Sequence, residues 1–510
     1  MNRVLEAIRR HQRTFFRGAL LFAISMYIAQ MISLPVGISY DGHIYIDMAD
    51  VLFSSRFPAQ WVAFRTPLYP LSLKVSFWFF GRQPIAIIAV SSIAAIAGII
   101  LLVVIVRRLV GDLAGGLAVI LLALDPNLVS YAHYALTETG IFAFLVLAIA
   151  FLLLVPEKHW RLWLKALGLA AIIAMGWYWR QYLISLAWPC ALLLGLRQWS
   201  SASREYSVAG AGESQRNPRT WTWIGRIVGP ILIVGIMPSI ATFPFRHFVN
   251  PAITELMTDI MLKNGIFKQA LTAPEDPFVG THRDEYVRAI QDSRFGGHLY
   301  SGLRARFTGS LANEVFSQPG APTGHQAFVA LVKKYPKRYF RGVWRNLMLF
   351  FGARGSEDEI EITRATILSR GWTEAPVGGG PEPISSADKA VFSERAVDSF
   401  VRDLYRSLYS LYDFLLPIGF IFLFIGLVAA CVWRQWNLFA FCFLPFIYLL
   451  PMALVLTSID RYGLPTHPVA LVSIFVVPIY LVRIVVRERQ IGLSRRAMHE
   501  PRESAVGVHS

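Results

Sequence analysis

The chain has 510 residues, of which 55% are hydrophobic and only 16% charged, and its formal net charge is +16. A soluble protein cannot bury so large an apolar fraction, so the composition excludes a water-soluble enzyme and predicts a membrane protein. The lysines and arginines cluster beside apolar runs, which favours membrane topology and anionic lipid as the reason for the charge, and we expect no nucleic-acid partner.

Apolar runs of about 20 residues, the length that a helix needs to cross a bilayer, recur along the chain. They predict an all-α integral membrane protein, a bundle of about ten transmembrane helices with a long, mainly helical extracytoplasmic segment. The predicted spans are 15–36, 84–106, 113–132, 136–155, 162–179, 182–197, 224–243, 411–433, 437–457 and 464–485. We expect three parts: an N-terminal transmembrane module (1–243, with a first outer loop at 37–83), an extracytoplasmic loop domain (244–410), and a C-terminal transmembrane module with a basic cytoplasmic tail (411–510).

The two ends of the chain set the predicted orientation. The basic N-terminus precedes an apolar run too long for a signal peptide, so we expect an uncleaved first helix. The positive-inside rule then places both termini in the cytoplasm of a multi-pass plasma membrane protein, with a bacterial inner membrane as the expected location. On the outer side, residues 325–351 predict an amphipathic helix in the head-group region, kinked at Pro336.

The first polar cluster at the outer boundary follows the first span. A short helix beginning near Asp41 would place Asp41, Tyr45, Met48 and Ala49 on one face. A carboxylate at the membrane edge is partly desolvated, which makes it a better general base. The alternative is that Asp41 only caps this short helix.

The second cluster is Arg65-Thr66-Pro67-Leu68-Tyr69-Pro70. The two prolines rigidify the entry to the next element. The guanidinium of Arg65 suits a phosphate because it donates two parallel hydrogen bonds. Anchoring of the loop to lipid is the alternative role.

The third cluster is the short outer turn that contains His133 and Glu138, between the third and fourth spans. An ionisable residue at that depth is costly and is therefore a candidate for function. Alternatively, Glu138 complements the dipole of the helix that it begins. Asp125-Pro126, just before this turn, predicts a structural helix start, with Asp as cap and Pro at the first helical position.

The fourth cluster comprises two further outer turns, one with Arg180 and one with Arg461 and Tyr462. Arginine on the outer side runs against the charge bias, so each is expected to face a carboxylate or a phosphate; Asp460 is the alternative partner of Arg461. The aromatic residues at 177–182 are interpreted as an ordinary interfacial belt.

At these same residues the chain resembles the GT-C superfamily of membrane glycosyltransferases, in the branch of protein O-mannosyltransferases and lipid A aminoarabinose transferases. The resemblance lies in four segments: Asp41 with Tyr45, residues 65–70 as an R-x-P-x-Y-P segment, the acidic turn ending at Glu138, and the late turn 460–468. The chain departs from the aminoarabinose branch in that its long polar segment lies between the seventh and eighth spans.

The resemblance implies an inverting glycosyltransferase that moves a sugar from a polyprenyl-phosphate donor to an extracytoplasmic glycan, lipid or protein. Asp41 would be the catalytic base and Glu138 a supporting acid. The expected substrate-binding residues are Tyr45, Arg65, Tyr69, His133, Arg180, Arg461 and Tyr462. No dense carboxylate or histidine cluster is evident, so we expect no metal or other cofactor.

Two alternatives remain open at this point. An O-antigen ligase or polymerase would use residues of the long loop: Arg246, His247, Arg283, His298 and His325. A flippase or transporter for a lipid-linked sugar would place charges along a path through the membrane, but the predicted spans are largely free of charge in their middles.

Overall fold

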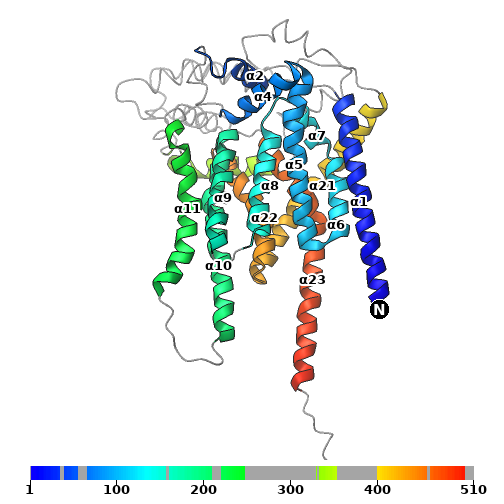
Figure 1. The fold of residues 1–510 in the computed structure, drawn as a ribbon, viewed down its shortest axis with the longest axis vertical. Coiled ribbons are helices and arrows are strands. Elements are labelled where there is room, and N and C mark those ends of the chain that lie inside the picture. Colours follow the sequence, from blue (N-terminus) through cyan, green and yellow to red (C-terminus); the bar gives the residue numbers. More distant parts are fainter. Residues whose placement is uncertain are drawn as a thin grey trace, which may run out of the picture.

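The computed structural model describes residues 2–34, 40–55, 66–156, 160–209, 220–246, 329, 332–352, 399–455 and 460–499. Throughout these residues the regular structure is helical, as predicted, and long helices run side by side to form a bundle (Figure 1). The short helices α2 and α4 lie at one end of the bundle, which we call the α2 end. The opposite end, beyond which α23 extends, is the α23 end.

The helices are α1 (Asn2–Ser33), α2 (Tyr40–Val51), α4 (Leu68–Phe80), α5 (Pro84–Val110), α6 (Asp112–Ala123), α7 (Pro126–Ala132), α8 (Glu138–Leu154), α9 (Trp160–Trp179), η1 (Gln181–Leu186), α10 (Ala187–Ala209), α11 (Thr220–Arg246), α18 (Pro336–Phe350), α21 (Ser399–Val432), α22 (Trp436–Val455), η4 (Asp460–Thr466) and α23 (His467–His499).

Helices occupy every one of the predicted spans, but fewer than ten of them are long and apolar enough to cross a membrane. Among the described residues, six helices are long and apolar enough to cross a membrane, or seven if the bent pair α6 and α7 forms one span. Helix α8 is shorter, with 17 residues. The sixth predicted span begins as a 3-10 helix, η1, and continues as α10. The chain is therefore a multi-pass helical membrane protein, and the count of ten is not confirmed.

The break between α6 and α7 bends the chain by 57°. The side chain of Asp125 accepts hydrogen bonds from the backbone N–H groups of Asn127 and Leu128, at 3.0 and 3.2 Å, and Pro126 follows at the first helical position. This confirms the predicted cap. Gln30 of α1 donates to the carbonyl oxygen of Ala123 at 3.3 Å, so a neighbouring helix satisfies a carbonyl at the break, as an apolar surrounding requires.

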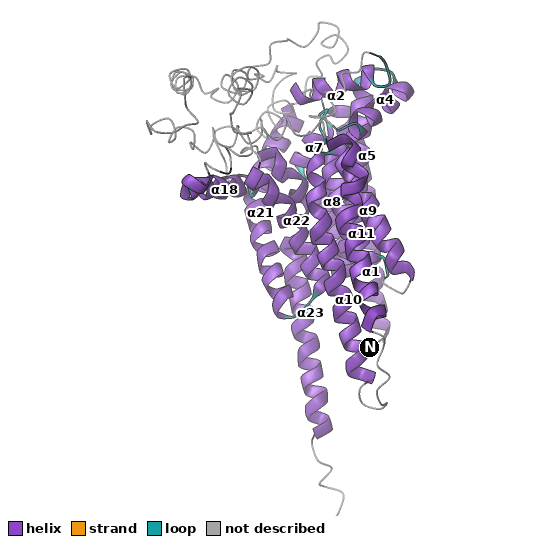
Figure 2. Cartoon of the chain, turned by 90° about the vertical axis from the view of Figure 1, so that its left-hand side faces the viewer, coloured by secondary structure: helices purple, strands orange, loops and turns teal. Residues whose placement is uncertain are grey.

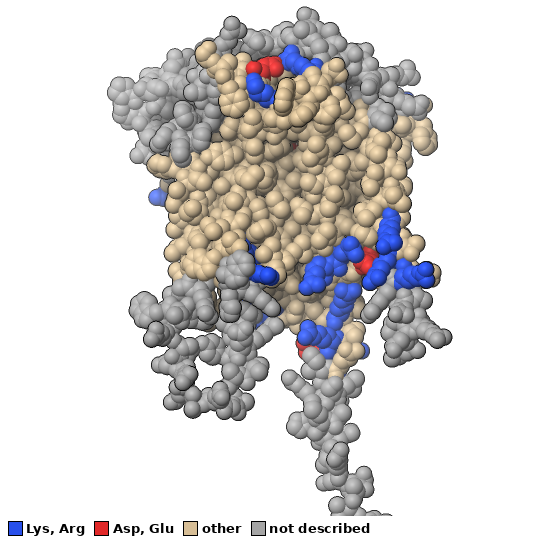
Figure 3. Space-filling model, in the orientation of Figure 1, with Lys and Arg blue, Asp and Glu red and all other residues tan. Residues whose placement is uncertain are grey.

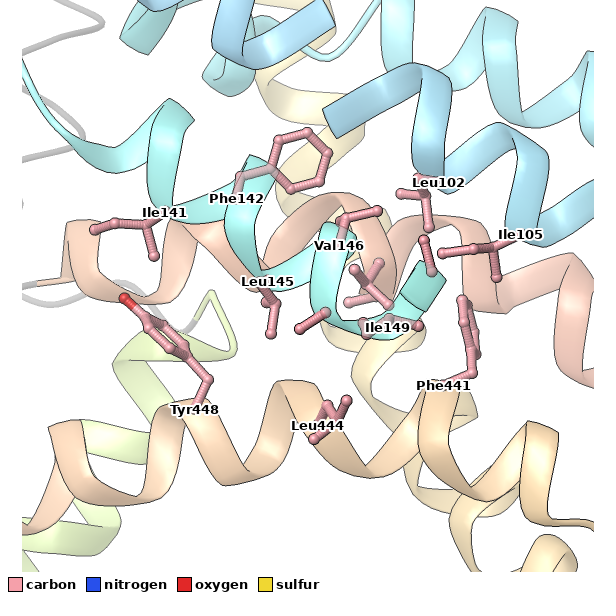
Figure 4. Packing of buried hydrophobic residues seen from close by; sticks show 14 of the residues in the cluster. Leu102, Ile105, Ile141, Phe142, Leu145, Val146, Ile149, Phe441, Leu444 and Tyr448 are labelled. Atoms are coloured by element: carbon pink, nitrogen blue, oxygen red, sulfur yellow. The ribbon is translucent and has the colours of Figure 1, made fainter. Parts of the chain in front are cut away.

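Helix α8 is enclosed by its neighbours. Figure 4 shows its apolar side chains between those of α5 and those of α22. A helix that is apolar on all sides is expected in the centre of a bundle. The central position of α8 matters for function because Glu138 is its first residue, at the α2 end. The labelled neighbours in Figure 4 are Leu102 and Ile105 of α5, and Phe441, Leu444 and Tyr448 of α22.

Basic side chains gather at the α23 end, at the bottom of Figure 3. Arg483 donates to the carbonyl oxygens of Leu109 and Val110, at 3.0 and 2.7 Å, where α5 ends. The buried Lys165 donates to the carbonyl oxygen of Leu152 at 2.7 Å, near the end of α8. The last carbonyls of a helix lack partners within the helix and carry partial negative charge, so these cations stabilise the helix ends.

Candidate functional site

Nine site residues were predicted from the sequence, and the structure describes the side chains of five: Tyr45, Tyr69, His133, Glu138 and Arg180. For three more it describes only the backbone: Asp41, Arg461 and Tyr462. Arg65 lies outside the described residues, as do the loop residues His247, Arg283, His298 and His325 of the ligase alternative.

Helix α2 confirms the predicted short helix at Asp41. Asp41 is its second residue, one helical turn before Tyr45. Tyr45, Met48 and Ala49, on the predicted face, are all buried. Lys74 of α4 donates to the carbonyl oxygen of Leu52 at 2.8 Å, which holds the end of α2 against α4. The backbone of Asp41 therefore belongs to a helix that is fixed at both its buried face and its far end.

Tyr45 connects α2 to the arginine of the α9–η1 turn. Arg180 is buried, and its guanidinium donates a hydrogen bond to the hydroxyl of Tyr45. The same guanidinium carbon lies 5.3 Å from the ring centroid of Tyr182, within the range of a cation–π interaction. These contacts bring together two predicted substrate-binding residues that are 135 positions apart in the sequence. They also orient the guanidinium.

Tyr69 lies between Tyr45 and Trp179. Its ring meets each of the other two edge to face, with centroids 5.0 Å from Tyr45 and 5.2 Å from Trp179. Burial raises the pKa of the Tyr69 phenol, and Tyr45 and Glu138 raise it further by electrostatic repulsion. Tyr69 therefore stays neutral at physiological pH, and Glu138 lies within electrostatic reach of it.

Trp179 is a connecting residue that the sequence did not identify. Its carbonyl oxygen accepts a hydrogen bond from the hydroxyl of Thr66, at 2.7 Å, and its indole N–H donates to the carbonyl oxygen of Thr137, at 2.9 Å. Thr137 immediately precedes Glu138. Trp179 thus joins the entry to α4, the acidic turn and Arg180, its neighbour in the chain.

The sequence predicted that Trp179 belongs to an interfacial belt, and its packing shows that this prediction is wrong. It is buried, and a Cβ added to Gly140 would lie only 2.0 Å from its indole ring. Glycine at position 140 therefore allows the ring to approach α8. The sequence contained a signal for this contact: a glycine two residues after the candidate acid, on a helix of large apolar side chains.

The acidic turn is itself buried. Glu138 is 1% exposed and His133 is 2% exposed. Tyr131, Tyr134 and Leu136 of this turn pack with Leu464 of η4. The late turn, whose backbone includes Arg461 and Tyr462, therefore lies beside the acidic turn, as the site predicted from the sequence requires.

The far side of η4 packs against α18. His467 Nε2 is 3.0 Å from the carbonyl oxygen of Phe350, and a Cβ added to Gly463 would lie 2.7 Å from that same oxygen. The late turn is thus held between the acidic turn and α18. Among the described side chains, no group of three or more His, Cys, Asp or Glu could hold a metal ion, and the expectation of a metal-free reaction stays a prediction.

Comparison with known proteins identifies the class of protein. Residues 65–211 match the family described as dolichyl-phosphate-mannose-protein mannosyltransferase. The match extends from Arg65 through α4 to α10 and includes Tyr69, His133, Glu138 and Arg180. It confirms the resemblance that the sequence predicted, and it indicates a membrane glycosyltransferase of the GT-C type.

Two solved structures are similar to the chain at low identity. Both are crystal structures of ArnT from Cupriavidus metallidurans, one bound to undecaprenyl phosphate and one in the apo state. Each is 12% identical and covers 89% of this chain; the alignments span 77% and 76% of the ArnT chains, with TM-scores of 0.33 and 0.31. No curated protein matches the chain.

Proposed function

We propose that this protein transfers a sugar from a polyprenyl-phosphate donor to an extracytoplasmic acceptor, with inversion at the anomeric carbon. The observation that carries the proposal is the hydrogen bond from Arg180 to Tyr45. It holds a buried cation against Tyr45, which follows Asp41 by one turn of α2. The family match supports the donor class, because dolichyl phosphate is a polyprenyl phosphate.

In the proposed reaction Asp41 accepts the proton of an acceptor hydroxyl while that oxygen attacks the anomeric carbon. The bond from this carbon to the phosphate oxygen breaks, and the polyprenyl phosphate leaves with both electrons of that bond. General-base assistance of this kind contributes about 100- to 10,000-fold to a rate. The acceptor is a glycan, lipid or protein with a free hydroxyl or similar nucleophile.

Arg180 stabilises the charge that develops on the leaving phosphate. A guanidinium offers five N–H donors in a fixed plane, and the contact with Tyr45 sets the orientation of that plane before the donor binds. Arg65 and Arg461 are the further proposed phosphate ligands. Arg461 belongs to η4, which packs beside the acidic turn, and Arg65 directly precedes Thr66 in the sequence.

Glu138 supports the site from the head of α8. It is buried beside Tyr69, and its preceding carbonyl is held by Trp179. We propose that it acts on the acceptor or on the sugar through Tyr69 and His133, and not as the base itself. Tyr462, in the turn beside it, completes the proposed sugar-binding surface.

The proposed orientation places the α2 end outside the cytoplasm. Basic side chains gather at the α23 end, and the positive-inside rule assigns such an end to the cytoplasm (Figure 3). With this orientation, in a bacterial inner membrane, a lipid-linked sugar would enter the site from the outer leaflet.

The test compares wild type and Asp41→Asn at matched expression, with transfer of radiolabelled sugar from a polyprenyl-phosphate pool to membrane acceptors as the readout. We expect a loss of about 100-fold or more, with the donor still bound. Asp50→Asn is the matched control on the same helix: Asp50 is partly exposed and pairs with Arg82 at 2.8 Å, so transfer should persist.

Transfer by Asp41→Asn at the wild-type rate would show that the base is elsewhere, and the histidines and arginines of the long loop would be tested next. Label that crosses the membrane without forming a product, in both proteins, would indicate a flippase.

A further inference from the structure

Helix α18 lies across the axis of the bundle, beside α21 and α22 (Figure 2). It begins at Pro336, after a residue with non-helical backbone angles, Tyr335 at φ −126° and ψ 53°. The described residues thus confirm the predicted helix from Pro336 onward and an interruption of the helix at that proline, while residues 325–328 and 330–331 of the predicted helix lie outside them. Because α18 is not parallel to the spans, its faces meet surroundings different from those of a transmembrane helix.

One stripe of α18 is fixed to the bundle. The hydroxyl of Tyr339 donates to the carbonyl oxygen of Leu454 at 2.8 Å. The side-chain amide of Asn346 donates to the carbonyl oxygen of Ala453 at 3.2 Å. Val343 and Phe350 in the same stripe are buried. The spacing of three to four residues defines a single face, and this face determines the rotation of the helix about its axis.

The rest of the helix surface divides into two further stripes. Phe340 and Trp344, four residues apart, are 60% and 62% exposed. At 3.6 residues per turn they lie about a third of a turn from the bundle-facing stripe. The exposed cations Lys337, Arg338 and Arg341 occupy the remaining arc. Aromatic and cationic side chains are therefore neighbours on α18 but do not intermix.

The charge on this segment has one sign. Lys333 and Lys334, in the turn before Pro336, are also exposed, and no aspartate or glutamate occurs between residues 329 and 352. A helix that lies flat, with large aromatics on one side and cations on the other, fits the boundary between acyl chains and head groups. Single-sign positive charge at that depth complements anionic phospholipid.

We propose that α18 is a binding surface for anionic phospholipid head groups, with Lys337 and Arg341 as principal contacts and with Phe340 and Trp344 inserted at the acyl boundary. The proposal does not depend on the transferase reaction. It has a consequence for the site, because Phe350 at the end of α18 packs on Gly463 of η4 and on His467, the first residue of α23. Lipid bound to α18 would anchor the late turn.

The first measurement is lipid retention by the purified full-length protein in native mass spectrometry, with phosphatidylglycerol and phosphatidylcholine as probes. Wild type should retain phosphatidylglycerol in preference to phosphatidylcholine, and Lys337→Gln/Arg341→Gln should lower the phosphatidylglycerol retained at least twofold. The control is Arg402→Gln/Arg406→Gln, which removes the same number of positive charges from α21. Arg406 already pairs with Asp403 at 3.0 Å. Equal retention by wild type and the α18 variant would overturn the proposal.

The second measurement tests depth and leaves the two principal contacts, Lys337 and Arg341, unchanged. Trp344→Cys and Arg338→Cys, each spin-labelled in a Cys431→Ser background and reconstituted into vesicles containing phosphatidylglycerol, should differ in exposure. The label at 344 should be relaxed mainly by oxygen and the label at 338 mainly by a water-soluble nickel chelate. Equal access of the chelate to both positions would place α18 in water and would overturn the proposal. Neither readout uses sugar transfer, so failure here is distinct from failure of the proposed function.

Discussion

The cations at the two ends of the bundle contact different kinds of group. At the α23 end, Lys165 and Arg197 donate to the carbonyl oxygen of Leu152, at 2.7 and 2.5 Å, and Arg483 donates to carbonyl oxygens at the end of α5. At the α2 end, Arg180 is directed to aromatic side chains, with a hydrogen bond to Tyr45. The first group has a sufficient structural explanation in the helix ends, whereas the orientation of Arg180 suits an anionic ligand.

Structural and functional cations in a membrane protein differ in the groups that they contact. A helix terminus offers partial negative charge to any nearby cation, so an arginine there indicates no ligand. An arginine oriented by a hydroxyl and an aromatic ring presents its N–H donors in a fixed plane, which is the geometry that suits an anionic ligand. The following substitutions test whether the two ends differ in this way.

The largest effect is expected for Arg180→Gln. Transfer should fall about 100-fold, because a preoriented donor to the leaving phosphate is lost. Arg483→Gln should instead lower stability by about 1–2 kcal/mol, because two hydrogen bonds from a charged donor are lost, and leave transfer unchanged below the unfolding temperature. Transfer rates and thermal unfolding midpoints of both variants in detergent provide the check. Equal loss of transfer in the two variants would remove the distinction between the ends.

A smaller effect is expected for Gly140→Ala. The new methyl group would collide with the indole of Trp179, whose N–H and carbonyl are both hydrogen-bonded, so overpacking should cost about 2 kcal/mol. If the strain is relieved by displacement of Arg180, transfer falls about 30-fold.

The matched control is Gly18→Ala on α1, where an added Cβ would meet nothing within 4 Å. The new methyl group has open space there, so both stability and transfer should change little. A larger loss of transfer in Gly18→Ala than in Gly140→Ala would contradict the role given to Trp179.

The smallest effect is expected for Trp179→Phe, which keeps a ring in the aromatic row but removes the hydrogen bond to Thr137. The loss should be about 1 kcal/mol, or about fivefold in transfer, with most of the change in kcat because the acidic turn shifts. Trp188→Phe is the control, because Trp188 is 57% exposed and lies outside the site. If the two variants transfer equally well, the Trp179–Thr137 bond does not position the acidic turn.

Much of the fold followed from local sequence properties. The apolar runs predicted the positions of the long helices because the free energy of placing a segment in a bilayer depends on its own composition. The Asp125 cap and the short helix after Asp41 were predicted for the same reason, since capping and side-chain periodicity act within a few residues. The number of crossings was less well determined, because α8 is short and the α6–α7 span is broken.

The candidate site shows the limit of this reasoning. Glu138 and Arg180 were selected because charged residues at the outer end of an apolar helix are costly unless they are used, and Tyr45 and Tyr69 were selected by the resemblance to the GT-C family. It interpreted Trp179 as part of an interfacial belt, because aromatic residues at a span boundary are common and their burial depends on neighbours elsewhere in the chain.

The class of protein, the helices and the side of the membrane where candidate residues gather were predicted from the sequence. Tertiary packing was needed to show that Arg180 meets Tyr45, that Trp179 donates to the carbonyl before Glu138, and that η4 packs on the acidic turn. Hydropathy sets the depth of a helix, but these contacts depend on its rotation and on its neighbours. Those are fixed by side-chain packing between segments far apart in sequence.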